Sequence, residues 1–215
     1  MTSVTLIIFL LSYLLGSLSW SYIISKLIWK EDIRQKGSGN SGASNMIINH
    51  GWKYGAIVFL LDFFKTFLAT KLIYLFEVSK NYPQDKILIV SAVAGFISIL
   101  GHIYPFWLNF KGGKGTASAL GLAFALDWKL GLIGIISIVV VTLVTNYIAI
   151  GGMTTWLFLA IGSWILFKST IISGLFILMM LISIFLHRKN IRRIKQGTEN
   201  GLKRKYDDKD KELMK

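Results

Sequence analysis

The chain has 215 residues, of which 53% are hydrophobic and 16% charged, and it carries a formal net charge of +13 with no cysteine. Soluble domains have about 25% charged residues, so this composition indicates an integral membrane protein and excludes disulfides, thiolate metal sites and a cysteine nucleophile. Lys and Arg gather beside apolar segments and in the C-terminal tail, which follows the positive-inside rule rather than the pattern of a nucleic-acid-binding surface.

Seven apolar segments are expected to cross the membrane, for which about 20 residues suffice. The first is expected to be a retained transmembrane helix, because no basic segment precedes it and it is too long for a signal peptide. The fourth is short, and we count it because seven spans place the basic loops on one side. The segments are 4–29, 54–76, 87–110, 117–126, 130–147, 153–167 and 171–186.

The basic tail belongs in the cytoplasm under the positive-inside rule. Counting back through seven spans places the loops at 30–53, 111–114 and 146–152 on the cytoplasmic side as well. The sequence therefore predicts an all-α, polytopic membrane domain over residues 1–202, with glycine-rich loops converging at the cytoplasmic face. Residues 203–215 are expected to form a charged, disordered tail.

A polar, glycine-rich segment separates the first two apolar segments and reads Gly37-Ser38-Gly39-Asn40-Ser41-Gly42-Ala43-Ser44-Asn45. Its glycines let backbone N–H groups approach an anion, and its Ser and Asn side chains donate hydrogen bonds. It matches G-x-G-x-x-G with Asp62 twenty residues on, but that dinucleotide motif requires a βαβ unit. We interpret the segment as a phosphate loop followed by a short helix over 43–50.

A second such loop, Lys111-Gly112-Gly113-Lys114-Gly115-Thr116, follows the third span. It is not a Walker A motif, because Gly115 stands where that motif requires Ser or Thr after the lysine. Two lysines and three glycines before a helix suit an anion cradle. A basic loop that touches lipid headgroups is the alternative.

Charged and titratable residues also lie within or beside the spans. Asp62 and Lys65 are three apart and share one helix face inside the second span. Charges in lipid are usually paired or functional, so a structural pair and a direct substrate contact both remain open. His102 is interpreted as a packing or capping residue. The basic stretch after His187 is, by composition, a topology signal and lipid anchor.

Three segments together resemble the bacterial acyl-phosphate:glycerol-3-phosphate acyltransferase family. They are the loop 37–45, the segment Lys111 to Ser118, and His187-Arg188-Lys189-Asn190-Ile191-Arg192-Arg193. Shorter matches lie at 13–17, 32–34, 62–65, 101–102 and 197–199, all in family order. The matching segments identify the family only when they are taken together, because no single segment is specific enough.

The resemblance implies a seven-helix enzyme of phospholipid synthesis that transfers a fatty acyl group from acyl phosphate to glycerol 3-phosphate, giving 1-acylglycerol 3-phosphate and phosphate. It implies neither cofactor nor metal, a multi-pass bacterial cell-membrane protein with a cytoplasmic active site, and the acyl-phosphate-forming enzyme as a partner. It implies catalytic roles for Lys114, His187 and Asn190. It implies substrate-phosphate binding by Gly37, Ser38, Gly39, Asn40, Gly42, Ser44, Asn45, Lys111, Gly112, Gly113 and Glu199.

The sequence departs from the family pattern at positions of the glycerol-phosphate pocket. The family usually has Arg at Ile48, Ser at Ala149 and Thr at Ser44, and many members have Arg at Asn146. Ile cannot replace a bidentate phosphate ligand. A different acceptor and a weakened paralogue that binds acyl phosphate or phospholipid as a regulatory partner are alternatives. A transporter is the third, although the sequence lacks the inverted repeat expected of one. Basic residues that could substitute for the Arg are Arg34, Lys36 and Lys53.

Overall fold

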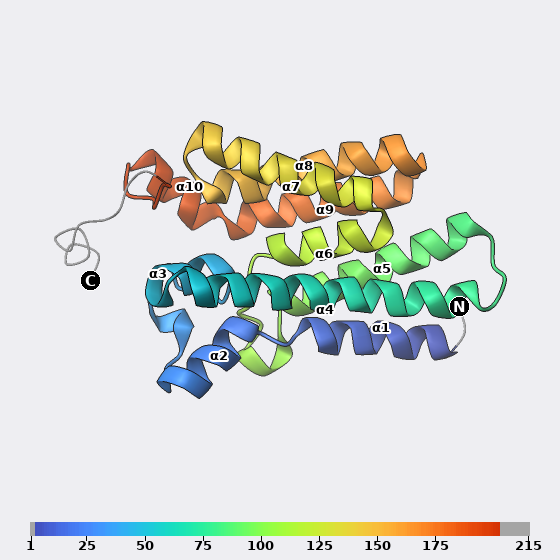
Figure 1. The fold of residues 1–215 in the computed structure, drawn as a ribbon, viewed down its shortest axis with the longest axis horizontal. Coiled ribbons are helices and arrows are strands. Elements are labelled where there is room, and N and C mark those ends of the chain that lie inside the picture. The colour runs from blue at the N-terminus through green and yellow to red at the C-terminus, as the bar shows by residue number, and fades with distance from the viewer. Residues whose placement is uncertain (1–2, 203–215) are drawn as a thin grey trace. The chain divides into compact units, whose positions relative to one another are not determined.

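The computed structural model describes residues 3–202, so the expected tail at 203–215 lies outside the described residues. The described residues form helices and no strand, in agreement with the predicted all-α class. The chain divides into two compact units, residues 1–132 and 133–215 (Figure 1). Each is described in turn.

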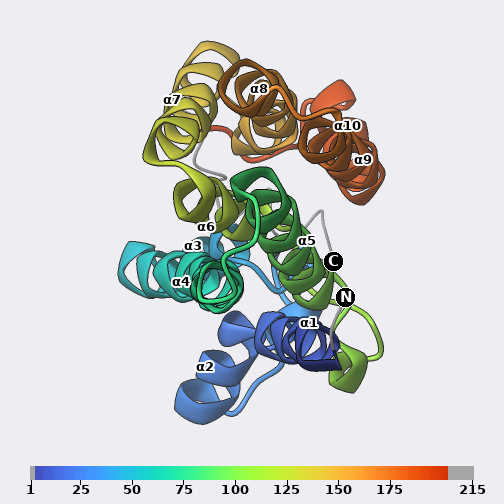
Figure 2. The same cartoon turned by 90° about the vertical axis from the view of Figure 1, so that its right-hand side faces the viewer.

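The first unit contains six helices and two 3₁₀ turns, and α7 (Trp128–Thr145) crosses its boundary with the second unit. Figure 1 shows the long α4 lying along the unit, and Figure 2 looks along the same helices. The bounds are α1 (Ser3–Gly16), α2 (Trp20–Trp29), η1 (Ile33–Gln35), α3 (Ala43–His50), α4 (Trp52–Val78), α5 (Gln84–Ile103), η2 (Phe106–Leu108) and α6 (Thr116–Leu126).

Helix α4 is the centre of the first unit, because α1, α2, α3, α5 and α6 all pack against it. The helices approach closely where glycines replace side chains, as is common in membrane bundles. A Cβ at Gly16 would lie 2.0 Å from the carbonyl oxygen of Ser98, and one at Gly121 would lie 2.1 Å from that of Phe63. These positions fix α1 against α5 and α6 against α4.

The first expected span, residues 4–29, consists of two helices rather than one. The axes of α1 and α2 differ by 43° across residues 17–19, where the sequence suggests one continuous apolar helix. The carbonyls freed at the break accept hydrogen bonds from other helices and loops: Trp107 Nε1 donates to Ser17 O at 2.8 Å, and Lys65 Nζ donates to Leu18 O at 2.7 Å. A break inside a bilayer requires such partners, because no water is available there.

The lengths of the other helices agree with most of the expected spans. In the described part of the chain, three helical segments are long and apolar enough to cross a membrane, 84–108, 128–145 and 148–167, and two bent pairs would raise this to five. Helix α6 is shorter, as the sequence suggests. The expected break at 146–152 is wrong in part, because α8 already begins at Ile148, after the left-handed residue Asn146 (φ 68°).

The second unit contains the end of α7, α8 (Ile148–Phe167), α9 (Thr170–Leu186) and α10 (Arg188–Lys195). Helices α8 and α9 pack together around Trp156 and Phe176, both fully buried. A Cβ at Gly151 would lie 2.8 Å from Ile138 O, so α8 also lies close to α7. Helix α10 turns away from α9 by 54° at His187.

Candidate functional site

Asn45 is the centre of the first glycine loop. Its side-chain nitrogen donates to the carbonyls of Ile33 at 2.9 Å and Lys36 at 3.1 Å. Its oxygen accepts from Ser38 N at 2.8 Å and from Asn49 Nδ2 at 3.1 Å. These four bonds use both donors and both acceptor lone pairs of the amide, and Asn45 is fully buried. The predicted ligand Asn45 therefore holds the loop in shape.

The loop closes tightly around that amide. Gly37 and Gly39 have φ values of +54° and +72°, a region that favours glycine. A Cβ at Gly37 would lie 2.4 Å from Asn45 Oδ1. The remaining predicted ligands of the loop reach its surface, either exposed or half-buried: Gly37, Ser38, Gly39, Asn40, Gly42 and Ser44.

The chain enters this loop through an ion pair. Arg34 lies 2.8 Å from Asp32 and also donates to Leu108 O at 2.9 Å, so it ties the first loop to the segment that leads to the second. The hydrogen bonds from Arg34 hold the pKa of the Asp32 carboxyl below its usual value, and Asp32 in turn raises the pKa of Arg34. This connection was not foreseen, although the segment 32–34 belongs to the family resemblance.

Arg34, Lys36 and Lys53, the three candidates to replace the Arg that the family usually has at Ile48, have different surroundings in the structure. Arg34 is committed to Asp32, and Lys36 forms an ion pair with Glu31, which also lies 2.9 Å from His50 Nε2. Among the ion pairs of residues 3–202, none includes Lys53. Lys53 is exposed at the start of α4, and Ile48 is 47% exposed on α3.

The second glycine loop folds back on the C-terminus of α5. Gly112 N donates to Ile103 O and Gly113 N donates to His102 O, both at 3.0 Å, which satisfies carbonyls at that helix end. A Cβ at Gly113 would lie 2.0 Å from His102 Nε2. Gly113 is therefore buried against the His102 ring, whereas Lys111 is exposed.

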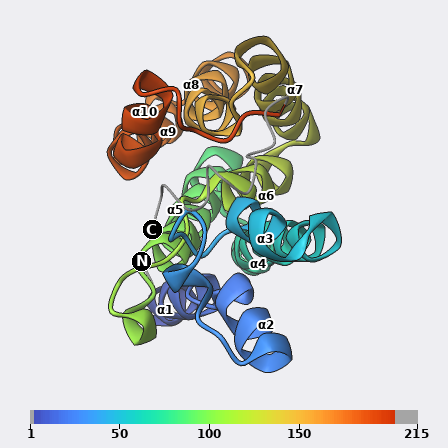
Figure 3. The ribbon, with the colours of Figure 1, turned by 90° about the vertical axis from the view of Figure 1, so that its left-hand side faces the viewer.

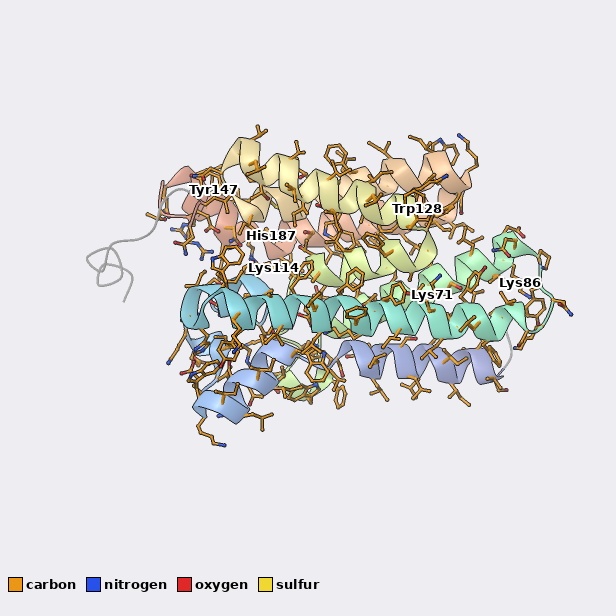
Figure 4. All side chains as sticks on the ribbon, in the orientation of Figure 1. Lys71, Lys86, Lys114, Trp128, Tyr147 and His187 are labelled. Atoms are coloured by element: carbon orange, nitrogen blue, oxygen red, sulfur yellow. The ribbon has the colours of Figure 1, made fainter. Side chains whose placement is uncertain are left out.

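Lys114 follows the buried Gly113, is half-buried, and stands two residues before α6. Gly115, at φ +85°, is the N-cap of α6. Lys114 lies toward the end of the unit that carries α3, and Lys86 lies at the other end (Figure 4). Figure 3 looks onto the α3 end and shows α2, α3 and the loops of this unit there. A lysine beside a helix N-terminus is a suitable environment for a phosphate.

The second unit holds the remaining predicted residues, of which His187 lies between α9 and α10 (Figure 4). His187 is 4% exposed, and its Nδ1 lies 2.8 Å from Ser183 O. A carbonyl only accepts, so Nδ1 carries a proton in this arrangement. Asn190 lies three residues further along α10 and is 6% exposed.

Glu199 is brought back to α10 by a turn at Gly197 (φ +70°). One of its carboxylate oxygens accepts from Asn190 Nδ2 and the other from Arg193 Nε. Both oxygens thus orient protein side chains, and Glu199 is 8% exposed. The structure therefore brings Asn190, Arg193 and Glu199 together.

Known proteins match most of the chain. A family model described as glycerol-3-phosphate acyltransferase matches residues 6–197. The chain is 36% identical to a glycerol-3-phosphate acyltransferase of Staphylococcus haemolyticus, covering 92% of this chain and 97% of that protein. It is 39% identical to one of Finegoldia magna, covering 92% and 96%.

A solved structure is similar throughout its length. The crystal structure of PlsY (YgiH), an integral membrane glycerol 3-phosphate acyltransferase in its glycerol 3-phosphate form, superposes with a TM-score of 0.83 at 32% identity. The match covers 93% of this chain and 96% of that one. The chain belongs to the glycerol-3-phosphate acyltransferase family.

Proposed function

We propose that this protein transfers a fatty acyl group from acyl phosphate to the hydroxyl of glycerol 3-phosphate, giving 1-acylglycerol 3-phosphate and phosphate for phospholipid synthesis. The observation that carries the proposal is the family match over residues 6–197, which includes both glycine loops, His187 and Asn190. The solved relative in its glycerol 3-phosphate form supports the choice of acceptor.

The chemistry of acyl transfer from acyl phosphate determines what the protein must supply. Acyl phosphate is a mixed anhydride and already activated, so no covalent enzyme intermediate is needed. The acceptor oxygen attacks the acyl carbon, the bond from that carbon to the phosphate oxygen breaks, and phosphate leaves. The protein must position two phosphate-bearing substrates and stabilise the oxyanion that develops.

The two glycine loops are assigned to phosphate binding, with Lys111 and Lys114 as donors together with backbone N–H groups other than those of Gly112 and Gly113, which are bonded to carbonyls of α5. His187 and Asn190 are assigned to orientation and stabilisation at the reacting centre, with Glu199 holding Asn190 in place. The proton of the acceptor hydroxyl passes to the departing phosphate. His187 is the rival base.

The membrane arrangement is part of the proposal. Seven crossings, with α4 and α6 among them, put the glycine loops and the C-terminus on the cytoplasmic side of a bacterial cell membrane. Residues 1–202 act as one functional domain, and the acyl-phosphate-forming enzyme is a partner at that face. The basic helix α10 supports this orientation, since five of its eight residues are Lys or Arg.

The test uses the purified full-length protein in lipid nanodiscs with palmitoyl phosphate and radiolabelled glycerol 3-phosphate. Lysophosphatidate and phosphate should appear in equal amounts, and Lys114→Met should abolish both. A palmitoyl thioester in place of the phosphate should give no product. Binding of palmitoyl phosphate without turnover would replace the enzyme proposal with the regulatory alternative, and turnover of the thioester alone would overturn the choice of donor.

A further inference from the structure

A cluster of three titratable side chains lies beneath the second glycine loop. Asp62 and Lys65 of α4 are 2% and 3% exposed, and His102 of α5 is 5% exposed. The three side chains contact one another. These contacts favour the structural pair over the direct substrate contact, the two alternatives that the sequence leaves open for Asp62 and Lys65.

The Lys65 ammonium contacts three polar groups. Its Nζ lies 2.7 Å from Asp62 Oδ1, 2.7 Å from Leu18 O and 2.9 Å from His102 Nδ1. His102 Nδ1 also lies 3.3 Å from Asp62 Oδ1, so the three side chains form one buried charged cluster. An ammonium has three donors, and the contacts of Nζ to Leu18 O and His102 Nδ1 join this cluster to the helix break and to α5.

Each partner of Lys65 leads to a different part of the candidate site. Leu18 O belongs to the break between α1 and α2, and α2 leads into the first glycine loop. His102 contacts the second loop twice, because its carbonyl accepts from Gly113 N and its ring occupies the space of a Gly113 Cβ. Ser118 of α6, just after the second loop, donates to Asp62 O at 3.1 Å.

We propose that Asp62, Lys65 and His102 are positioning residues for acyl transfer: they hold the helix break before the first glycine loop and the Gly112-Gly113 turn of the second in one fixed arrangement. The three side chains do not touch substrate. They act through Leu18 O and Gly113. The inference rests on the proposal that the loops bind the phosphates of the substrates.

The alternative is that the cluster contributes only to stability, and a paired substitution distinguishes the two. Asp62→Asn with Lys65→Met removes both charges and keeps the side-chain volumes, and such replacements of buried ion pairs are often neutral or stabilising. The bonds from Nζ to Leu18 O and His102 Nδ1 are lost. Small misplacements of substrate-binding groups cost about a hundredfold in rate.

The double variant is therefore expected to lose about a hundredfold in kcat/KM for palmitoyl phosphate and glycerol 3-phosphate, with raised KM values and an unchanged or higher melting temperature. The matched control is Thr66→Val with Ser98→Ala, which removes a buried hydrogen bond of 3.1 Å between the same two helices. The control should keep kcat/KM. A double variant with a normal melting temperature and kcat/KM within about threefold of wild type would overturn the proposal.

If the double variant Asp62→Asn with Lys65→Met fails to fold, a double-mutant cycle at Gly113 and His102 still tests the proposal. Gly113→Ala places a methyl group against the His102 ring, whereas His102→Asn keeps a polar atom near Lys65 and removes the part of the ring next to Gly113. Gly113→Ala should cost about a hundredfold in the wild-type background and less than about tenfold in the His102→Asn background. Gly174→Ala, where a Cβ would meet nothing within 4 Å, is the control.

Equal losses in both backgrounds would show that the His102 ring does not position the loop. Lys114→Met separates this outcome from a failure of the site assignment. If Lys114→Met is inactive while the charge-free double variant is fully active, the positioning proposal alone is wrong. If Lys114→Met keeps full activity, the assignment of the second loop to phosphate binding is wrong as well.

Discussion

The most informative single substitution in the first glycine loop is at Asn45, because its amide makes four hydrogen bonds within the loop. Each hydrogen bond contributes about 1 kcal/mol net, so Asn45→Ala should lower the free energy of local loop opening by about 4 kcal/mol. That corresponds to a roughly thousandfold increase in the opening equilibrium. The four partners all lie in the segment from η1 to α3, and the long helices α1, α4 and α5 keep their own bonds, so global unfolding should change little.

Asn45→Asp should be more damaging than Asn45→Ala, although Asp has the same shape as Asn. The donor Nδ2 would become a carboxylate oxygen that faces two carbonyls, those of Ile33 and Lys36, at 2.9 and 3.1 Å. Replacing two attractive contacts with repulsive ones adds to the loss of hydrogen bonds. The order of loop stability is therefore wild type, then Ala, then Asp.

Hydrogen–deuterium exchange of residues 33–42 in nanodiscs measures this opening, and trypsin cleavage after Lys36 gives an independent readout. Asn40→Ala is the matched control, because Asn40 lies in the same loop, is half-buried and is assigned to substrate binding. It should raise KM without changing exchange. Wild-type exchange in Asn45→Ala would refute the structural role and return Asn45 to the set of direct phosphate ligands.

Three further predictions concern the ligands and charges around the loops. Ile48→Arg should lower KM for glycerol 3-phosphate about tenfold, because a guanidinium binds phosphate in a bidentate manner; an unchanged KM would show that this position does not face the acceptor. His187→Ala should lower kcat by less than about a hundredfold if phosphate takes the proton, and a loss near 10⁴-fold with both substrates still bound would make His187 the base. Asp32→Asn should cost roughly 1 kcal/mol of stability at neutral pH. Because Arg34 lowers the folded-state pKa of Asp32, this difference is present above about pH 4 and should shrink as the pH falls through the folded-state pKa, which thermal unfolding of both proteins between pH 3 and 7 would measure.

The all-α class and the positions of the glycine loops could be read from the sequence, because long apolar runs and polar glycine clusters are local signals. The break between α1 and α2 could not. Residues 17–19 lie within an otherwise apolar run, and the break depends on Trp107 and Lys65 from distant segments, which supply its hydrogen-bond partners. A single sequence contains no signal for which carbonyl a distant lysine will reach.

The candidate site likewise has features that the sequence predicts and others that it does not. The sequence indicates both polar glycine loops, and the resemblance places Glu199 in the same region as His187 and Asn190, but neither indicates that Asn45 and Gly113 are buried. An Asn that binds phosphate and an Asn that binds its own loop are the same residue type in the same motif. Only the four partners of Asn45 distinguish them.

The distribution of charge at the first loop indicates how it can hold a phosphate. Arg34 and Lys36 lie within reach of the loop in sequence, yet each is paired with a carboxylate, Asp32 or Glu31. A cation that already has a carboxylate partner contributes little net attraction to a second anion. If the loop binds phosphate as proposed, its attraction for the anion comes from backbone dipoles and small polar side chains rather than from these two cations. Such groups are dipoles at fixed positions, so their contribution depends on the exact shape of the loop, and that shape depends on the amide of Asn45.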